Sequence, residues 1–166
     1  MTLDGKRDGL DALKLGNELT TRRYLFHKIP VSKVLNVPEY IAMRMIMHTD
    51  EAEDIYDGKT YLKDIAEMMQ LSIRQTSKLV SGLKERGLIK WVHDGNGSDG
   101  TYVTVTPSGR ELFTQQEKTM KELYERVIER FGADNLIQLL NLMKELETHM
   151  ESEIEEMELM NDDAAE

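Results

Sequence analysis

The stretch from Thr60 to Thr106 most constrains how this chain can fold, because two short helical patterns there lead directly into two alternating patterns. The first pattern predicts a helix of about two turns that Thr60 caps, with apolar residues at helical spacing: Leu62, Ile65, Ala66 and Met69. Gln70 and Leu71 follow and are expected to turn the chain. A second helix is therefore expected close behind the first.

Ser72 begins this second helix, since Gln75 completes a capping box and Gly87 suits a left-handed C-terminal residue. One face is expected to be buried: Ile73, Thr76, Leu79, Val80 and Leu83. The opposite face is polar and basic: Arg74, Gln75, Ser77, Lys78, Ser81 and Lys84. Residues 72–93 carry five Lys or Arg against one acid. This pattern is typical of a helix that binds a polyanion.

The segment after Gly87 predicts a β-hairpin, with strands at residues 88–92 and 101–106 and a glycine-rich tip between them. Helix, turn, helix and hairpin is the layout of a winged helix-turn-helix, in which the second helix enters the major groove and the hairpin follows the DNA backbone. We expect Lys90 and His93 of the leading strand to be available to that backbone. For Trp91, packing on the second helix is favoured over stacking on a sugar or base.

The segment from Tyr61 through LSIRQTSKLVSGLKERGLIKWV to VTVTPSGRELF resembles the winged-helix core of the MarR family, the multiple-antibiotic-resistance type of bacterial transcription regulator. With the flanking helices, the resemblance covers residues 10–157. It implies a homodimer that binds double-stranded DNA through these positions: Arg74, Gln75, Ser77, Lys78 and Ser81. The family commonly has an Asp-Arg-Arg signature near the hairpin tip, whereas residues 98–101 here read Ser-Asp-Gly-Thr.

A first helix is expected to run from Leu10 to Ile29, where Pro30 prevents its continuation. Its apolar residues form one face: Leu13, Leu15, Leu19, Leu25, Phe26 and Ile29. The resemblance implies that this face forms half of a dimerisation layer, and the alternative is an ordinary packing helix of a monomer. Dimerisation is favoured because the core of residues 60–106 is too small to cover this much apolar surface.

Two long helices are predicted after the hairpin. Thr106 and Pro107 begin the first, whose apolar stripe ends at Gly132: Leu112, Phe113, Met120, Leu123, Tyr124, Val127, Ile128 and Phe131. Asp134 is expected to cap the second, whose apolar residues are Leu136, Ile137, Leu139, Leu140, Met143, Leu146, Met150, Ile154 and Met157. We expect the two helices to form an antiparallel pair, and the second to present a coiled-coil seam to another protomer.

Pro38 is expected to begin a further helix, over residues 38–51, that is apolar nearly all round. The resemblance implies that such a helix forms one wall of a pocket for a small-molecule effector, and we assign Tyr40, Met43 and Met47 to that wall. The alternative for these side chains is plain core. His48 stands beside four acids, but a solvated connection is favoured over a metal site because helical ligand pairs need spacings of three or four.

The net charge of −10 is concentrated at one end, because residues 145–166 contain ten acids and no Lys or Arg. Residues 1–144 therefore carry 21 of the 31 acids against 21 bases, and a local basic patch can still bind DNA. A solubilising role for the acidic end is favoured over a mimicry of DNA that would inhibit the protein's own binding.

The sequence also argues against other classes of function. It has no Cys, which excludes a disulfide framework, a thiolate zinc site and a cysteine redox switch. It has no apolar run long enough to cross a bilayer and no signal peptide at its N-terminus, so we expect a cytoplasmic protein with no membrane partner. Ser77 and Ser81 have no nearby His, and no phosphate loop occurs, so we expect neither catalysis nor a cofactor.

The sequence thus predicts a mainly α fold with a small β-hairpin wing, divided into a flexible arm at 1–9, dimerisation helices at 10–36 and 107–160, a winged helix-turn-helix lobe at 37–106 and a disordered acidic tail at 161–166. We expect a ligand-responsive repressor that binds a pseudo-palindromic operator as a homodimer, with Arg74 and Gln75 at base edges and Lys78 and Lys84 at phosphates. The alternative is a winged-helix protein-interaction module without specific DNA binding, which the arginine-free wing and the acidic end keep open.

Overall fold

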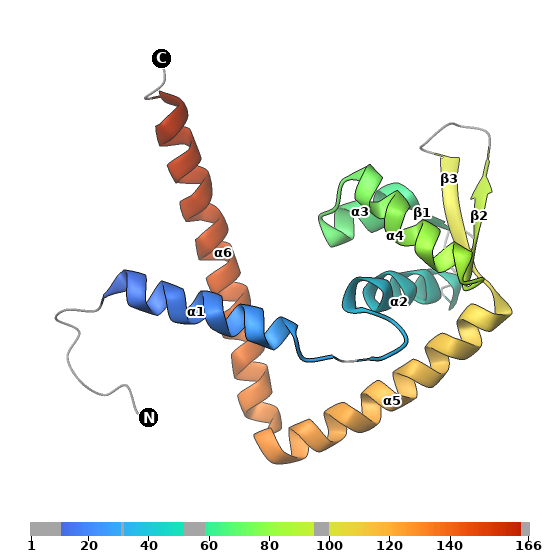
Figure 1. Cartoon of the computed structure of the whole chain (residues 1–166), viewed down its shortest axis with the longest axis horizontal. Helices are drawn as coiled ribbons and strands as arrows, with labels where there is room; N and C mark the ends of the chain where they lie inside the picture. The colour runs from blue at the N-terminus through green and yellow to red at the C-terminus, as the bar shows by residue number, and fades with distance from the viewer. Residues whose placement is uncertain (1–10, 31, 52–58, 95–99, 164–166) are drawn as a thin grey trace. The chain divides into compact units, whose positions relative to one another are not determined.

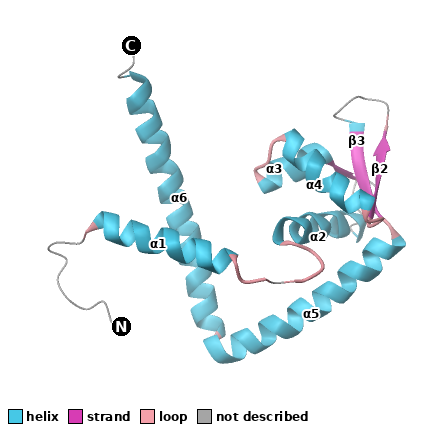
Figure 2. Ribbon diagram, in the orientation of Figure 1, coloured by secondary structure: helices cyan, strands magenta, loops and turns pink. Residues whose placement is uncertain are grey.

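The structure, a computed structural model, describes residues 11–30, 32–51, 59–94 and 100–163 of the chain (Figure 1). The described residues form six helices and a three-stranded antiparallel sheet (Figure 2). The chain divides into two compact units, residues 1–116 and residues 117–166. The predicted fold class, mainly α with a β-hairpin wing, is confirmed.

The first helix of the helix-turn-helix is α3 (Leu62–Met69), which has the predicted two turns. The predicted cap is wrong, because Thr60 lies in a short strand before the helix and is 2% exposed. Tyr61 occupies the cap position instead and forms no side-chain cap bond. Gln70 ends α3 in the left-handed region, at φ 53°, and so reverses the chain toward the next helix.

The second helix, α4 (Ile73–Glu85), has the predicted signals at both ends. The hydroxyl of Ser72 accepts from the Gln75 N–H at 3.2 Å, and Gln75 Oε1 accepts from the Ser72 N–H at 2.9 Å. The capping box is therefore confirmed. Gly87 has φ +72°, and the N–H of the next residue donates to the Leu83 carbonyl oxygen at 3.1 Å, which closes the C-terminal turn.

The sheet consists of β1 (Thr60–Tyr61), β2 (Ile89–His93) and β3 (Thr101–Val105), in the order β1-β3-β2. β2 and β3 pair antiparallel with Trp91 opposite Val103, which confirms the predicted hairpin. β1 pairs with the outer edge of β3 and was not predicted. A strand of two residues is too short to show an alternating pattern.

One core joins the sheet to α2 (Val37–Glu51), α3, α4 and the start of α5 (Pro107–Phe131). Its large fully buried side chains include Leu35, Met43, Ile46, Ile65, Val80, Leu83, Val103 and Phe113. Burying each contributes about 1.5–3 kcal/mol, which makes this core the main source of stability for the lobe. The predicted burial of Ile73 is wrong, because this first residue of α4 lies beyond the edge of the core and is 49% exposed.

α5 begins as predicted, with the Thr106 hydroxyl accepting from the Gly109 N–H at 3.0 Å. The same hydroxyl donates to the Gly87 carbonyl oxygen at 2.6 Å, and so ties the start of α5 to the end of α4. Gly109 lies directly against the backbone of Leu88, where an added Cβ would stand 1.9 Å from the carbonyl oxygen. A residue without a side chain is therefore required here.

The N-terminal helix, α1 (Ala12–His27), is capped by Asp11, whose Oδ1 accepts from the Leu13 N–H at 3.1 Å and the Lys14 N–H at 3.2 Å. The predicted helix is confirmed. None of its residues is buried, and Leu13 and Phe26 are 72% and 71% exposed. Its apolar face is therefore not covered by the described part of residues 1–116.

In residues 117–163 the second half of α5 leads into α6 (Ala133–Asp163) through Gly132, which has φ +93°. The predicted cap is wrong, because α6 begins one residue before Asp134 and has this acid in its first turn. The predicted antiparallel pair is also wrong. In the described part of this unit the apolar stripes of both helices stay exposed: Leu123, Tyr124, Val127, Ile128, Phe131, Ile137, Leu139, Leu140, Met143 and Leu146.

Candidate nucleic-acid interface

The outward face of α4 presents the polar and basic residues that the sequence assigns to DNA. Burial of Thr76, Val80 and Leu83 fixes the rotation of the helix. The opposite positions are therefore directed outward, where Arg74, Gln75, Lys78 and Lys84 are exposed and Ser77 and Ser81 are half-buried. Arg74 and Lys78 form no ion pair with any described residue. Their full charge is available to an external anion.

Gln75 Oε1 is the atom that both the helix cap and the predicted contact to adenine would use. Its Oε1 accepts from the Ser72 N–H in the capping box. Reading adenine in the major groove would use the same oxygen as acceptor and the amide nitrogen as donor. A bidentate contact from Gln75 to adenine would thus share the oxygen with the helix cap.

Lys84 joins the end of α4 to the hairpin through an aromatic ring. Its Nζ lies 5.8 Å from the centroid of the Trp91 ring, a cation–π arrangement. Trp91 is half-buried against the core, so its favoured packing on α4 is confirmed. The ring also stacks on His93 at 6.4 Å, and His93 Nδ1 is 2.9 Å from the Thr101 hydroxyl. His93 is therefore positioned by both strands of the hairpin.

Lys90 lies on the other face of β2, exposed and opposite Thr104. The Asp94 N–H donates to the Gly100 carbonyl oxygen at 2.9 Å and closes the base of the hairpin tip. Residues 95–99 lie outside the described residues, and Asp99, which replaces a family arginine in the sequence, is among them. The predicted loss of a wing contact therefore stays a prediction.

Arg86 is a basic residue of this segment whose guanidinium is bound within the protein. Its Nη1 donates to Glu39 Oε2 at 3.2 Å, and its Nη2 donates to the Val34 carbonyl oxygen at 2.7 Å. Arg86 is one of the five Lys or Arg counted in residues 72–93. No local pattern in the sequence indicates its partners, which lie 47 and 52 residues away. The basic character of the segment therefore depends on its other four Lys and Arg residues: Arg74, Lys78, Lys84 and Lys90.

Two features of the interface were not predicted. Ile73 places an exposed apolar side chain at the start of the recognition helix, where base contacts are made in helix-turn-helix proteins. A second group lies where β1 meets β3: the rings of Tyr61 and Tyr102 are 5.8 Å apart, and a lysine ammonium lies over each ring. Lys59 precedes the predicted helix and Lys63 lies within it, so no shared periodicity groups these two lysines.

The residues assigned to an effector pocket belong to the core or its edge. Met43 and Met47 are 0% and 5% exposed, and Tyr40 stacks on Phe113 at 5.3 Å.

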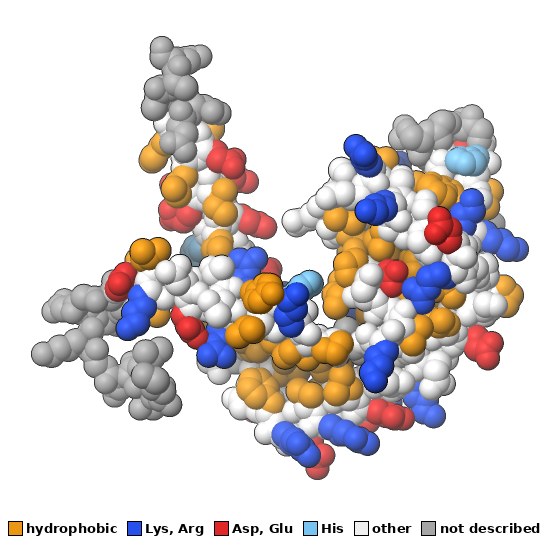
Figure 3. Space-filling model, viewed as in Figure 1, with side chains coloured by type: hydrophobic (Ala, Val, Ile, Leu, Met, Phe, Trp, Pro, Cys, Tyr) orange, Lys and Arg blue, Asp and Glu red, His pale blue; other side chains and the backbone are white. Residues whose placement is uncertain are grey.

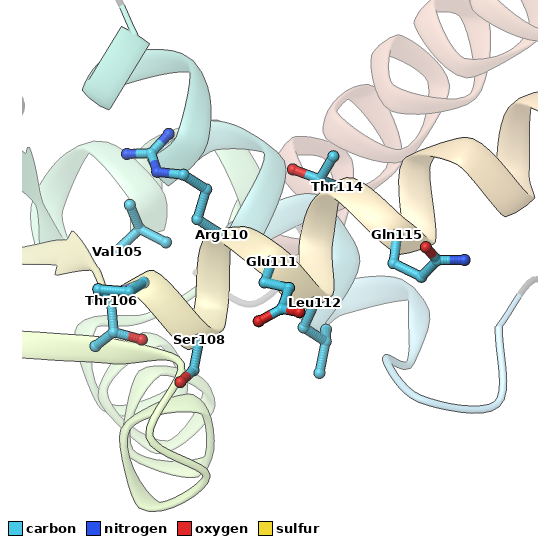
Figure 4. Close-up of a pocket in the computed structure, with 9 residues that line it drawn as sticks. Val105, Thr106, Ser108, Arg110, Glu111, Leu112, Thr114 and Gln115 are labelled. Atoms are coloured by element: carbon cyan, nitrogen blue, oxygen red, sulfur yellow. The ribbon is translucent and has the colours of Figure 1, made fainter.

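Two cavities formed by described residues are lined by residues other than Tyr40, Met43 and Met47. One, of about 890 Å³, adjoins the start of α5 (Figure 4): Val105, Thr106, Pro107, Ser108, Arg110, Glu111, Leu112, Thr114 and Gln115. The other, of about 310 Å³, lies between α1 and α2: His27, Lys28, Ile29, Pro30, Ser32, Leu35, Asn36, Val37 and Pro38. The effector pocket stays a prediction.

Acidic side chains gather along α6 in Figure 3. Between residues 145 and 160 the sequence has seven acids and no Lys or Arg.

His48 is the last residue of α2 whose side chain the structure describes, and the side chains of its acidic neighbours lie outside the described part. Elsewhere among the described residues, no three His, Asp or Glu side chains are placed to hold a metal ion. No helix in the described ranges is long and apolar enough to span a membrane.

No protein-family model and no curated protein sequence matches the chain. Solved structures do match. NMB1585, a MarR family regulator from Neisseria meningitidis, is 21% identical with a TM-score of 0.62, over 86% of this chain and 95% of its own.

Two further structures have similar scores. The PcaV transcriptional regulator from Streptomyces coelicolor, in complex with its natural ligand, is 17% identical with a TM-score of 0.62, over 84% of this chain and 93% of its own. BpsR from Bordetella bronchiseptica, whose DNA binding is regulated by 6-hydroxynicotinic acid, is 16% identical with a TM-score of 0.59. The match covers 86% of this chain and 97% of BpsR. The chain therefore shares the winged-helix fold of the MarR family of transcriptional regulators.

Proposed function

We propose that the protein is a sequence-specific DNA-binding transcription regulator of the MarR type. The observation that carries the proposal is the outward face of α4, where Arg74 and Lys78 are exposed and unpaired among the described residues of a capped recognition helix. In this role Arg74 suits guanine, Gln75 suits adenine, and Lys78 and Lys84 suit phosphates. Lys90 and His93 would follow the backbone from the leading strand of the wing.

The proposed active form is a homodimer. Its support is the large apolar surface that the described residues leave exposed on α1, α5 and α6. A surface of this extent is typical of helices that pack against a second protomer. Two recognition helices related by a two-fold axis would read half-sites about one helical turn apart, which gives a pseudo-palindromic operator.

We further propose repression that a small molecule relieves. PcaV has a structure with its natural ligand, and BpsR has its DNA binding regulated by 6-hydroxynicotinic acid. In this chain a ligand would act by favouring a separation of the two recognition helices that does not match the half-sites.

A genomic-fragment selection with the purified protein tests the proposal. The expected result is enrichment of fragments that share a pseudo-palindromic element, called the operator below. A parallel selection with an Arg74→Ala, Lys78→Ala variant is the control and should enrich nothing. Enrichment of the same fragments by both proteins would contradict the assignment of α4 as the reading helix.

The second candidate is a protein-interaction module. It is favoured by the fact that Arg86 is bound to Glu39 and Val34, which removes one cation from an already modest basic patch. This candidate predicts weak binding to random duplex with a shallow salt dependence. The first candidate predicts a steep one, since each neutralised phosphate releases counterions.

A further inference from the structure

We propose that Arg86 is a positioning residue that ties the recognition helix α4 to the linker before α2, residues 32–36, and so makes operator selectivity depend on that linker. The inference rests on the proposed DNA-binding function. It requires no contact between Arg86 and DNA, because the side chain is directed toward α2 and the linker.

Arg86 immediately follows the last residue of α4 and binds two groups at once. One guanidinium nitrogen donates to Glu39 Oε2 at 3.2 Å, and the other donates to the Val34 carbonyl oxygen at 2.7 Å. The planar guanidinium fixes the direction of both bonds. The end of α4 is thus held to the linker and to the first turn of α2 by one side chain.

The linker is itself held by hydrogen bonds and by one buried side chain. The Ser32 hydroxyl accepts from the Val34 N–H at 3.0 Å and the Leu35 N–H at 3.2 Å, and it donates to Gln116 Oε1 of α5 at 2.5 Å. Leu35 is 1% exposed and anchors the linker in the core. A change at Ser32 therefore displaces the carbonyl group that Arg86 binds.

The linker ends in a capping box that includes the other partner of Arg86. Glu39 Oε2 accepts from the Asn36 N–H at 3.0 Å, and Asn36 Oδ1 accepts from the Glu39 N–H at 2.9 Å. The Glu39 oxygen that caps α2 is the same oxygen that binds Arg86. The start of α2 and the end of α4 are therefore coupled through one carboxylate.

This arrangement gives the linker a direct effect on the reading geometry. Hydrogen bonds to base edges tolerate distance errors of only a few tenths of an ångström. An anchor at the end of α4 sets the angle at which Arg74 meets the groove. On its other side the linker lines the cavity of about 310 Å³ beside the end of α1. A structural change of the linker at this cavity would therefore be transmitted to α4 through Arg86.

A double-mutant cycle tests the coupling. Arg86→Lys keeps the positive charge at the end of α4 but cannot bind Glu39 and Val34 together. Ser32→Ala removes the hydroxyl that shapes the linker. For wild type, both single variants and the double variant, affinities are measured by anisotropy for the selected operator and for a scrambled duplex. Lys33→Ala, at an exposed linker position with no partner among the described residues, is the control.

Each single variant is expected to lower the ratio of operator to scrambled affinity about fivefold to tenfold, which corresponds to roughly 1–1.4 kcal/mol. The double variant should be no worse than the more severe single variant, and Lys33→Ala should match wild type. Additive losses in the double variant, or an unchanged ratio in Arg86→Lys, would overturn the coupling.

A second readout works without DNA. Hydrogen exchange at the last turn of α4 should be faster in Ser32→Ala than in wild type, with no such difference when Arg86→Lys is already present. An equal effect of Ser32→Ala in both backgrounds would overturn the coupling even if DNA binding is normal. If wild type binds no DNA, the proposed function fails, whereas the exchange data still decide whether α4 and the linker are coupled.

Discussion

Gly109 shows how closely the start of α5 approaches the end of α4. A Cβ at this position would lie 1.9 Å from the Leu88 carbonyl oxygen and 2.8 Å from its carbonyl carbon. The contacting atoms are backbone, so they cannot rotate out of the way. The contact allows the Thr106 hydroxyl to bind the Gly87 carbonyl oxygen, and it thereby fixes the recognition helix against α5.

Gly109→Ala is therefore expected to lower the free energy of unfolding by about 2–4 kcal/mol, because α5 must move away from Leu88. Urea denaturation followed by Trp91 emission measures the change. The control is Gly82→Ala, where an added Cβ meets nothing within 4 Å and the helix should gain stability by about 0.5–1 kcal/mol. Similar unfolding energies for the two variants would contradict the close contact.

Ile73 is an apolar residue that the described lobe leaves half-exposed. It is the first residue of α4 and is 49% exposed. In the major groove the complementary apolar group is the thymine methyl. Ile73 is thus expected to select for thymine at one position of each half-site.

Replacing single thymines of the operator with uracil removes only the methyl group and tests this expectation. Wild type should lose about 1 kcal/mol, roughly fivefold in affinity, at one position per half-site, whereas Ile73→Ala should be insensitive to the same change. An equal loss of affinity on uracil replacement in wild type and in Ile73→Ala would contradict a contact between Ile73 and a thymine methyl.

Among the elements, α4 was the most predictable from the sequence, because its start and end signals are local. Ser72 and Gln75 are three residues apart, and Gly87 directly follows the helix, so their roles do not depend on tertiary contacts. The hairpin was predictable for the same reason, since alternation and a glycine-rich tip are local signals.

The remaining elements and site residues depend on contacts that are distant in the sequence. β1 is a strand only because β3 pairs with it much later in the sequence, with Thr60 opposite Val103, 43 residues away. The contacts of Arg86 could not be predicted, because its partners lie 47 and 52 residues earlier. Ile73 has the spacing of a buried residue, but helical periodicity does not show where a core ends.

At the scale of the whole molecule, the exposed apolar stripes decide the expected assembly. Leu139 and Met143 of α6 are 41% and 43% exposed, and the second half of α5 adds residues of similar exposure. Leaving such surfaces in water is unfavourable by about 25 cal/mol for each Å². We therefore expect a second protomer to cover them.

Replacing Leu139 and Met143 with Glu should give a monomer, because the seam would then bury like charges. The control adds the same two charges at neighbouring exposed polar positions, Gln138→Glu and Asn141→Glu, and should remain a dimer. Light scattering after size exclusion measures the mass. A dimer in the Leu139, Met143 variant, or a monomer in the control, would be inconsistent with a seam along this face.

The most direct test of the central claim, that α4 reads DNA, is an anisotropy titration of operator and scrambled duplex at several salt concentrations with wild type, Arg74→Ala and Lys84→Ala. Wild type should prefer the operator at least about a thousandfold. Arg74→Ala should cost about 1–3 kcal/mol on the operator alone, whereas Lys84→Ala should weaken both duplexes about equally and reduce the salt slope by about one. Equal affinity of wild type for both duplexes, with a shallow salt slope, would contradict the claim and favour the protein-interaction module.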